Sequence, residues 1–334
     1  MTTQLPINIP IASFAAQVCL GSLLVGFTDS GSPFRFVGLP AIGGLFWLVF
    51  KTVSDGIRPA QAGLVVATAF AFTLQYCEVA LVRRASFKDS PKWPHDTFWN
   101  RLCFGTYIIC SMRAVGTKWQ AGNVPPVKTT SRTASLVRSV WVCLVVFLWF
   151  DLASLNPQVD HDDNFVRVKE YVLTRFCEVD RDELVLRAIA SLSSYIKLYG
   201  IFSFWGEMMS FVTVLLGICD PSQWPPIFGS VGDAWSLRQF WGSVRGFSLF
   251  LFYSHFPLSV FWHQWLTLPF CGPATWFTQS VLGLKRNTPT AKYAHLFLVF
   301  FLSGTLHTIS NIANRVSPSH TGAMMCFAPK HLAS

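Results

Sequence analysis

The stretch KYAHLFLVFFLSGTLHTISNI, residues 292–312, is mostly apolar. A helix rises about 1.5 Å per residue, so about 20 apolar residues cross the hydrocarbon core of a bilayer. We therefore predict a membrane-spanning helix here. Similar runs lie at 12–27, 36–53, 62–82, 136–155 and 195–217, and a further apolar run lies at 246–268. The pattern predicts an all-α, polytopic integral membrane helix bundle of about six to seven spans.

The composition supports the same fold class. Hydrophobic residues make up 51% of the 334 residues and charged residues only 13%. Soluble domains carry about 25% charged residues, so a chain this poor in charge cannot cover a surface that faces water. We expect a single membrane domain over residues 1–334, with the lipid bilayer as its solvent.

The formal net charge is +9. Such a charge is compatible with nucleic-acid binding, but the basic residues are spread over the loops between predicted spans and no stretch interleaves them with aromatic residues. Membrane proteins collect Lys and Arg in cytoplasmic loops. We therefore expect no nucleic-acid partner.

The charged loops predict the orientation of the chain. Residues 83–135 contain nine Lys or Arg and two acids, whereas residues 156–194 contain eight acids and five bases. The positive-inside rule places 83–135 in the cytosol and 156–194 in the lumen. Within the basic loop, the apolar segment Arg101–Met112 is too short to span and is expected to form an interfacial or re-entrant helix.

Several kinds of site are not indicated by the sequence. The nine cysteines form no CxxC pair and no Cys/His cluster with zinc spacing, so we expect small core hydrophobes and no metal. The chain has no GxSxG, P-loop, GxGxxG or HExxH motif. The uncharged residues Met1 to Ile11 lack the basic region of a secretory signal, which favours a retained first span.

His307 lies late in the run 292–312. An ionisable residue inside a membrane helix is costly to insert and is by default a candidate for function. Neutral imidazole can act as a general base near neutral pH. The alternative is a histidine that only bonds a neighbouring helix, and position alone leaves both open.

Two further groups of polar residues are ambiguous. Asp233, Arg238, His263 and Gln264 lie among many aromatic residues, which are typical of the membrane interface but also suit a site for one apolar and one polar substrate. Glu207 is a lone acid in a predicted span and suggests either a helix-packing partner or part of a polar cavity. His255 and His295 have no companions in the sequence and are expected to be structural.

Five short pieces, in order, resemble the wax-synthase-like branch of the membrane-bound O-acyltransferases, in particular enzymes of fungal terpenoid and meroterpenoid biosynthesis. The pieces are Arg113–Gln120 with Asn123–Pro125, Pro225–Ser230, Ser236–Gly242, Phe261–Gln264 and Ser303–His307. The resemblance implies acyl transfer from an acyl-CoA, often acetyl-CoA, to a hydroxyl of a terpenoid acceptor. It also implies a catalytic region at residues 220–312.

The resemblance also implies roles for individual residues. His307 would be the catalytic base and His263 the second catalytic position, while the residues implied to bind substrate are Gln264, Trp262, Trp241, Arg238 and Asp233. Arg238 and the basic loops would attract the CoA phosphates. Acyl-CoA would be a co-substrate with no bound cofactor, and the compartment would be the endoplasmic reticulum.

The sequence departs from the family pattern at two places. Residues Ser243 to Leu258 intervene between two pieces that are nearly adjacent in relatives, which indicates either an extra helix or a retained intron. Relatives also continue for further helices after the histidine, so we expect a C-terminally shortened bundle. These departures keep an inactive family member open as an alternative to the enzyme. A membrane transporter also stays open, because His307, Glu207 and other polar residues in the spans could line a permeation path.

Overall fold

The structure is a computed structural model. It describes residues 8–57, 59–90, 92–93, 95–121, 124, 131–154, 180–228 and 267–315, and every regular element in these ranges is a helix. Six of the helices are long and apolar enough to cross a membrane: Ile9–Phe27, Phe34–Asp55, Gln61–Val82, Arg132–Leu152, Arg181–Leu215 and Pro289–Ala313. They confirm the polytopic all-α fold and the six predicted spans. The apolar run at 246–268 lies, but for its last two residues, outside the described ranges.

The chain forms two compact units, although the sequence led us to expect one domain over 1–334. The first unit consists of residues 1–125 together with 228–334, and the second of residues 126–227. The sequence carries no composition break that would mark this division, because both units are built from the same apolar helices.

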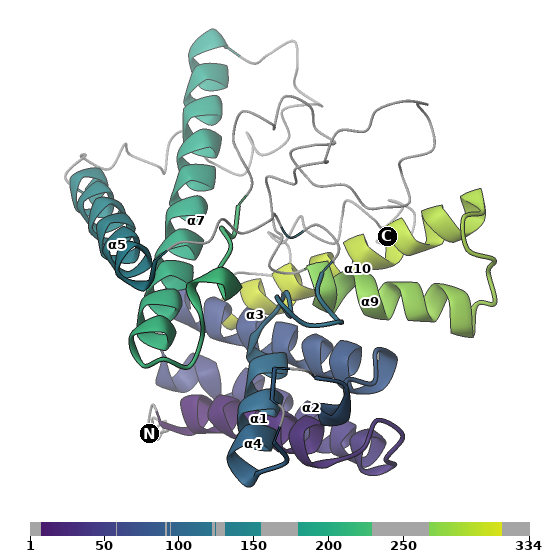
Figure 1. Cartoon of the computed structure of the whole chain (residues 1–334). Coiled ribbons are helices and arrows are strands. Elements are labelled where there is room, and N and C mark those ends of the chain that lie inside the picture. The colour runs from purple at the N-terminus through teal and green to yellow at the C-terminus, as the bar shows by residue number, and fades with distance from the viewer. Residues whose placement is uncertain are drawn as a thin grey trace, which may run out of the picture. The chain divides into compact units, whose positions relative to one another are not determined.

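The first unit begins with three long helices: α1 (Asn8–Phe27), α2 (Phe34–Gly56) and α3 (Pro59–Tyr76). A π-helical turn, η1 (Cys77–Val82), continues α3, and a short 3-10 turn, η2 (Phe87–Asp89), leads to α4 (Phe98–Cys110). α1 packs against both α2 and α4 (Figure 1). α4 corresponds to the helix expected at Arg101–Met112. Its position at the membrane interface and the cytosolic location of residues 83–135 stay predictions.

α1 and α4 approach each other at two glycines. A Cβ atom on Gly105 would lie 2.0 Å from the Ser22 carbonyl oxygen, and one on Gly26 would lie 2.4 Å from that of Arg101. Real Cβ atoms do not come so close, so the crossing requires glycine on both helices. The adjoining core includes the buried residues Val25, Tyr76, Phe104, Ile108, Trp119 and Leu268.

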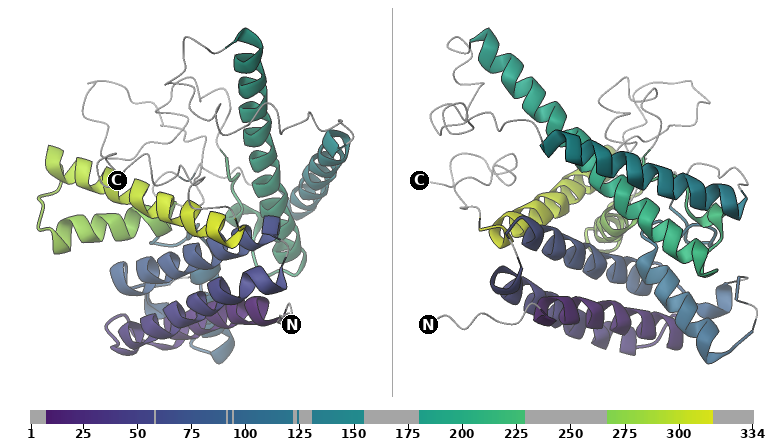
Figure 2. Two further views of the ribbon diagram at one scale, coloured as in Figure 1. Left: turned by 180° about the vertical axis from the view of Figure 1, so that it is seen from behind. Right: turned by 90° about the vertical axis from the view of Figure 1, so that its left-hand side faces the viewer.

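The same unit ends with two antiparallel helices. α9 (Thr267–Trp276) continues into the π-helical turn η7 (Phe277–Val281), and α10 (Pro289–Ala313) returns beside it next to α3 (Figures 1 and 2). α10 begins sharply because the Thr288 hydroxyl accepts the Ala291 N–H and proline occupies the first helical position. The sequence did not predict α9, which is too short to be recognised as a span.

The second unit contains α5 (Arg132–Ser154), α7 (Arg181–Leu215) and the short turn η4 (Pro221–Gln223). α5 and α7 pair antiparallel (Figure 2), since Arg132 Nη2 at the start of α5 donates to the Leu215 carbonyl at the end of α7, 2.9 Å away. α7 begins at Arg181 rather than at residue 195. The polar start is stabilised by Asp180, whose side chain accepts the Asp182 N–H.

Glu207 pairs α7 with α5. Arg138 Nη2 donates to Glu207 Oε1 at 2.8 Å, and the Ser139 hydroxyl donates to Glu207 Oε2 at 2.7 Å. Both carboxylate oxygens therefore bind the neighbouring helix. Of the two roles that the sequence left open, the structure supports the helix-packing partner.

The cysteines do not lie where the sequence suggested. Seven are described and all are free; Cys19, Cys103 and Cys110 are exposed and the other four half-buried. None of these seven lies in the fully buried core, which differs from the expected core positions. Among the described residues, no group of three His, Cys, Asp or Glu has the arrangement of a metal site.

Candidate active site

His307 lies on the outer face of α10. The opposite face of the helix is buried and includes Leu306 and Ala313, whereas the face that carries His307 also presents Tyr293 and Phe297, which are 67% and 55% exposed. The imidazole is exposed within the described part of the chain and makes no hydrogen bond to another described residue. Among the described residues, none occupies its nitrogens.

The hydroxyls beside His307 are bonded to their own helix. Thr305 Oγ donates to the Phe301 carbonyl at 2.9 Å, and Thr308 Oγ donates to the Gly304 carbonyl at 2.8 Å. These contacts are common for threonine in helices and leave its hydroxyl proton occupied. Imidazole is therefore the side chain in Ser303–Thr308 that is suited to take a proton.

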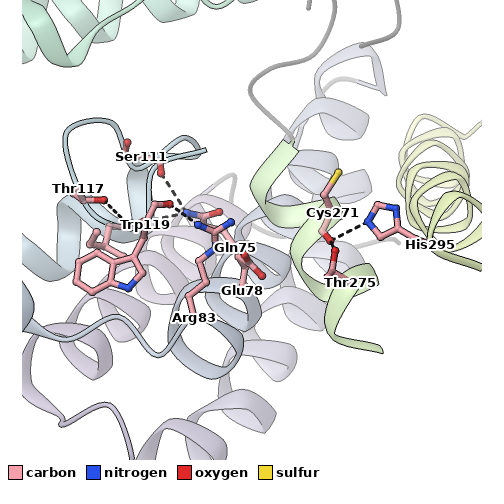
Figure 3. Close-up of polar contacts among 10 residues, drawn as sticks. Gln75, Glu78, Arg83, Ser111, Thr117, Trp119, Cys271, Thr275 and His295 are labelled. Atoms are coloured by element: carbon pink, nitrogen blue, oxygen red, sulfur yellow. Dashed lines mark hydrogen bonds and ion pairs between the residues drawn. The ribbon is translucent and has the colours of Figure 1, made fainter. Parts of the chain in front are cut away.

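His295 has a structural contact at the other end of α10. Its Nε2 lies 3.3 Å from the Cys271 carbonyl oxygen on α9, which also accepts from Thr275 Oγ at 2.6 Å (Figure 3). A carbonyl only accepts, so Nε2 carries the proton in this contact. The structural role expected for His295 agrees with this bond between two helices.

A buried ion pair lies at the end of α3, and sequence reasoning missed it. Arg83 Nε donates to Glu78 Oε1, and Arg83 Nη1 donates to the Trp119 carbonyl at 2.7 Å (Figure 3). The Glu78 side chain is only 1% exposed. The π turn brings the two residues together, because Arg83 N–H also donates to the Glu78 carbonyl five residues before it.

Glycine on α9 makes room for this carboxylate. A Cβ atom on Gly272 would lie 1.7 Å from Glu78 Oε2, so any larger residue would displace the carboxylate. One turn earlier on α3, Gln75 Nε2 donates to the carbonyls of Ile108 and Ser111 at 3.1 and 3.3 Å (Figure 3). Polar side chains of α3 thus bind both the end of α4 and the loop that follows it.

That loop is the Arg113–Gln120 piece of the sequence. It closes on itself, since the Gly116 N–H donates to Gln120 Oε1 and Thr117 Oγ donates to the Ala114 carbonyl, each at 2.7 Å. Gly116 has φ +73°, which favours glycine. Burial lowers the pKa of Arg113 to about 10, so this arginine stays protonated at neutral pH. The piece is a folded turn bound by Arg83 at the Trp119 carbonyl, and Gln75 of α3 binds the Ser111 carbonyl just before it.

Comparison with known proteins shows what this chain is similar to. The family model described as "Membrane bound O-acyl transferase family" matches residues 258–328. Acetyltransferase atnC of Arthrinium sp is 27% identical over 341 residues, covering 94% of this chain and 74% of the relative. Acetyltransferase aurG of Calcarisporium arbuscula is 28% identical over 315 residues (85% and 72%), and acetyltransferase spyB of Aspergillus fumigatus is 24% identical over 333 residues (93% and 52%). No solved structure matches the chain.

The chain is thus similar to the membrane-bound O-acyltransferase family over residues 258–328 and to fungal acetyltransferases over most of its length.

These matches, together with the six apolar helices, support a multi-pass membrane enzyme that transfers acyl groups to oxygen. The match to the membrane-bound O-acyltransferases includes α9, α10 and His307, and it also includes the positions of His263 and Gln264. The Glu78–Arg83 pair and the Arg113–Gln120 turn lie outside the matched residues.

All five residues predicted to bind substrate fall outside the described ranges, namely Asp233, Arg238, Trp241, Trp262 and Gln264. The second predicted catalytic residue, His263, also lies outside them. The structure therefore places His307 and leaves the roles of the others as predictions. Glu78 carried a signal in the sequence, namely an acid within an apolar span and a base five residues later where the span ends.

Proposed function

We propose that this O-acyltransferase moves an acetyl group from acetyl-CoA to a hydroxyl of a terpenoid or meroterpenoid, with His307 as the general base. The observation that carries the proposal is the free imidazole on the outer face of α10, within the residues that match the family. The names of the relatives, all acetyltransferases, support the acetyl donor. The acceptor class rests on the ordered sequence pieces of this branch.

The reaction needs one proton acceptor. Neutral His307 takes the proton from the acceptor hydroxyl while the oxygen attacks the thioester carbonyl carbon. The tetrahedral intermediate collapses, the carbon–sulfur bond breaks, and the thiol leaves with the proton from the imidazolium. A new ester and free CoA are the products, and imidazole is regenerated. Activity should fall at acid pH, because a protonated imidazole cannot act as a base.

The surroundings of His307 suit an apolar acceptor. Tyr293 and Phe297 extend the exposed face of α10 from His307 toward the start of the helix. Rings of this size bury large apolar area, as a polycyclic terpenoid would require. An acceptor that dissolves in the bilayer could reach this face directly, and we propose the endoplasmic reticulum as that membrane.

The remaining roles are assigned by the resemblance. His263 or Gln264 would hold the acceptor or polarise the thioester carbonyl, Trp241 and Trp262 would line the acceptor site, and Arg238 with Asp233 would bind the polar part of a substrate. Positioning two substrates beside one base supplies much of the rate in transfers of this kind.

The test is transfer of labelled acetyl groups by microsomes that contain the full chain. Radiolabelled acetyl-CoA is supplied with a panel of hydroxylated polycyclic terpenoids, and ester formation is followed in the organic extract. We expect transfer by the native chain and none above background by His307→Ala. His295→Gln is the matched control, because it changes a histidine of the same helix but keeps a donor for the Cys271 carbonyl.

Transfer that survives in His307→Ala contradicts the assignment of the base. A chain that reaches the membrane in full amount but transfers nothing to any acceptor contradicts acetyl transfer, and indicates an inactive family member.

A further inference from the structure

His307 depends on its helix for its position. Within the described part of the chain, the imidazole is held by the backbone of α10 alone. Near its start, α10 is tied to α9 by the 3.3 Å contact of His295. Its other end carries several polar contacts at once, and His307 is about two turns before that end.

We call the residues that make these contacts the latch. They are Ser54, Gly63, Ala313, Asn314 and Arg315. Ser54 Oγ donates to the Ala313 carbonyl at 3.2 Å, and Arg315 Nη2 donates to the Ser54 carbonyl at 2.6 Å. The Arg315 guanidinium also lies 3.9 Å from Asp55. The end of α10 is therefore bound to the end of α2 in both directions.

Asn314 binds the start of α3. The Gly63 N–H donates to Asn314 Oδ1 at 2.7 Å. A Cβ atom on Gly63 would lie 2.5 Å from the Asn314 amide atoms and 2.6 Å from Ser310 Oγ. The two helices approach so closely here that only glycine leaves room for the asparagine.

The backbone at this point is also unusual. Arg315 has φ +60°, in the left-handed region that residues other than glycine seldom adopt. Such a conformation persists when surrounding contacts hold it in place. The two bonds of Arg315 to the end of α2 are contacts of this kind.

We propose that Asn314 and Arg315 are positioning residues for acyl transfer, which fix the last turns of α10 and thereby hold His307 at its substrate. The inference rests on the proposed role of His307. Helix ends leave carbonyl groups unsatisfied and fray easily, and here Ser54 satisfies the carbonyl of Ala313. Catalytic groups must be held within about 0.5 Å of their productive geometry, so fraying two turns away is sufficient to lower the rate.

The kinetic test compares two substitutions of one residue. Asn314→Ala removes the acceptor of the Gly63 N–H, while Asn314→Asp keeps an acceptor oxygen. We expect Asn314→Ala to lower kcat about tenfold with the KM for acetyl-CoA unchanged, because the base is displaced and the donor site is not. Asn314→Asp should retain most of the rate, and Gly63→Ala should resemble Asn314→Ala. Thr68→Val on α3 is the control, since its hydroxyl donates to the Leu64 carbonyl of its own helix and it lies outside the latch and the residues that match the family.

Hydrogen exchange followed by mass spectrometry gives a readout that needs no activity. In Asn314→Ala the amides of residues 304–313 should exchange about fivefold faster, as expected from the loss of one hydrogen bond, while residues 289–300 keep the native rate. In Asn314→Asp both segments should keep the native rate.

The outcomes separate the two proposals. If His307→Ala stays active, the role of the base fails whatever the exchange shows. If His307→Ala is inactive but Asn314→Ala keeps the native kcat and the native exchange of residues 304–313, the latch does not position His307. A loss of kcat in Asn314→Ala that Asn314→Asp does not restore also overturns the inference, because it separates the rate from the bond to Gly63.

Discussion

Glu78 shows at the scale of one residue how an acid is accommodated inside an apolar helix. Its carboxylate is 1% exposed and is bonded by Arg83, which is itself 31% exposed and also binds the Trp119 carbonyl. Removing one partner of a buried pair leaves an uncompensated charge, which costs about 3–5 kcal/mol where both groups are buried. Because Arg83 is partly exposed, we expect about 2–3 kcal/mol for Arg83→Ala.

This prediction is measured as the loss of thermal stability in detergent. The double variant Glu78→Gln/Arg83→Ala is the control, because it removes the charge as well as its partner. The double variant should lose less thermal stability than Arg83→Ala, because it has no unpaired carboxylate. Equal losses in the single and double variants would assign the effect to the Trp119 contact.

Gly272 gives a second prediction at this scale. A Cβ atom there would lie 1.7 Å from Glu78 Oε2, so Gly272→Ala must move the carboxylate or α9. We expect a loss of about 1–3 kcal/mol, the usual cost of overpacking. Combined with Gly272→Ala, Glu78→Gln should not reduce this stability loss, because glutamine has the same size as glutamate. Glu78→Ala should reduce the loss, because it removes the atoms that clash. Relief of the loss by Glu78→Gln would contradict a steric cause.

At the scale of helices, the crossing of α1 and α4 depends on glycine. Gly105→Ala places a Cβ atom 2.0 Å from the backbone oxygen of Ser22, which cannot rotate away as a side chain can. We expect a thermal stability loss of about 1–3 kcal/mol. Gly43→Ala in α2 is the matched control, since its Cβ meets nothing within 4 Å and alanine favours a helix by up to about 1 kcal/mol. Equal effects of the two substitutions would contradict the close crossing.

The helices differ in how well the sequence predicted them. Runs of about 20 apolar residues indicate spans directly, so all six were found. α9 was missed because its 10 residues carry no signal distinct from a loop beside a span. The start of α7 was missed because residues 181–194 are charged, and their helix rests on the Asp180 cap and on the Arg187–Glu183 pair rather than on apolar character.

At the scale of the whole molecule, the chain separates into two units of helices. In the second unit, a polar contact between α5 and α7 can be removed by a single substitution. Glu207 binds Arg138 and Ser139 on the neighbouring helix. Glu207→Ala should lower thermal stability by about 1–3 kcal/mol, because it leaves two donors without their acceptor. Glu207→Gln, which keeps one acceptor oxygen, should cost less. A larger loss in Glu207→Gln than in Glu207→Ala would contradict this role.

The site was only partly predictable from sequence. His307 was identified because an ionisable residue in a span is uncommon, and the structure adds that its ring is exposed on the outer face of α10 among the described residues. The latch could not be foreseen, because Ser54, Gly63 and Asn314 are ordinary residues whose meaning comes from contacts between distant segments. The same holds for Gly272, whose partner Glu78 lies on another helix.

His307 as the general base is tested most directly by the rate of acetyl transfer in His307→Gln. The glutamine side chain has about the same size as the histidine side chain but no basic nitrogen. Microsomes with equal amounts of the native and variant chains receive labelled acetyl-CoA and an acceptor that the native chain esterifies. General-base catalysis typically contributes about 10²–10⁴-fold, so we predict a kcat at least about 100-fold lower in the variant. A kcat within a few-fold of the native value would contradict His307 as the base.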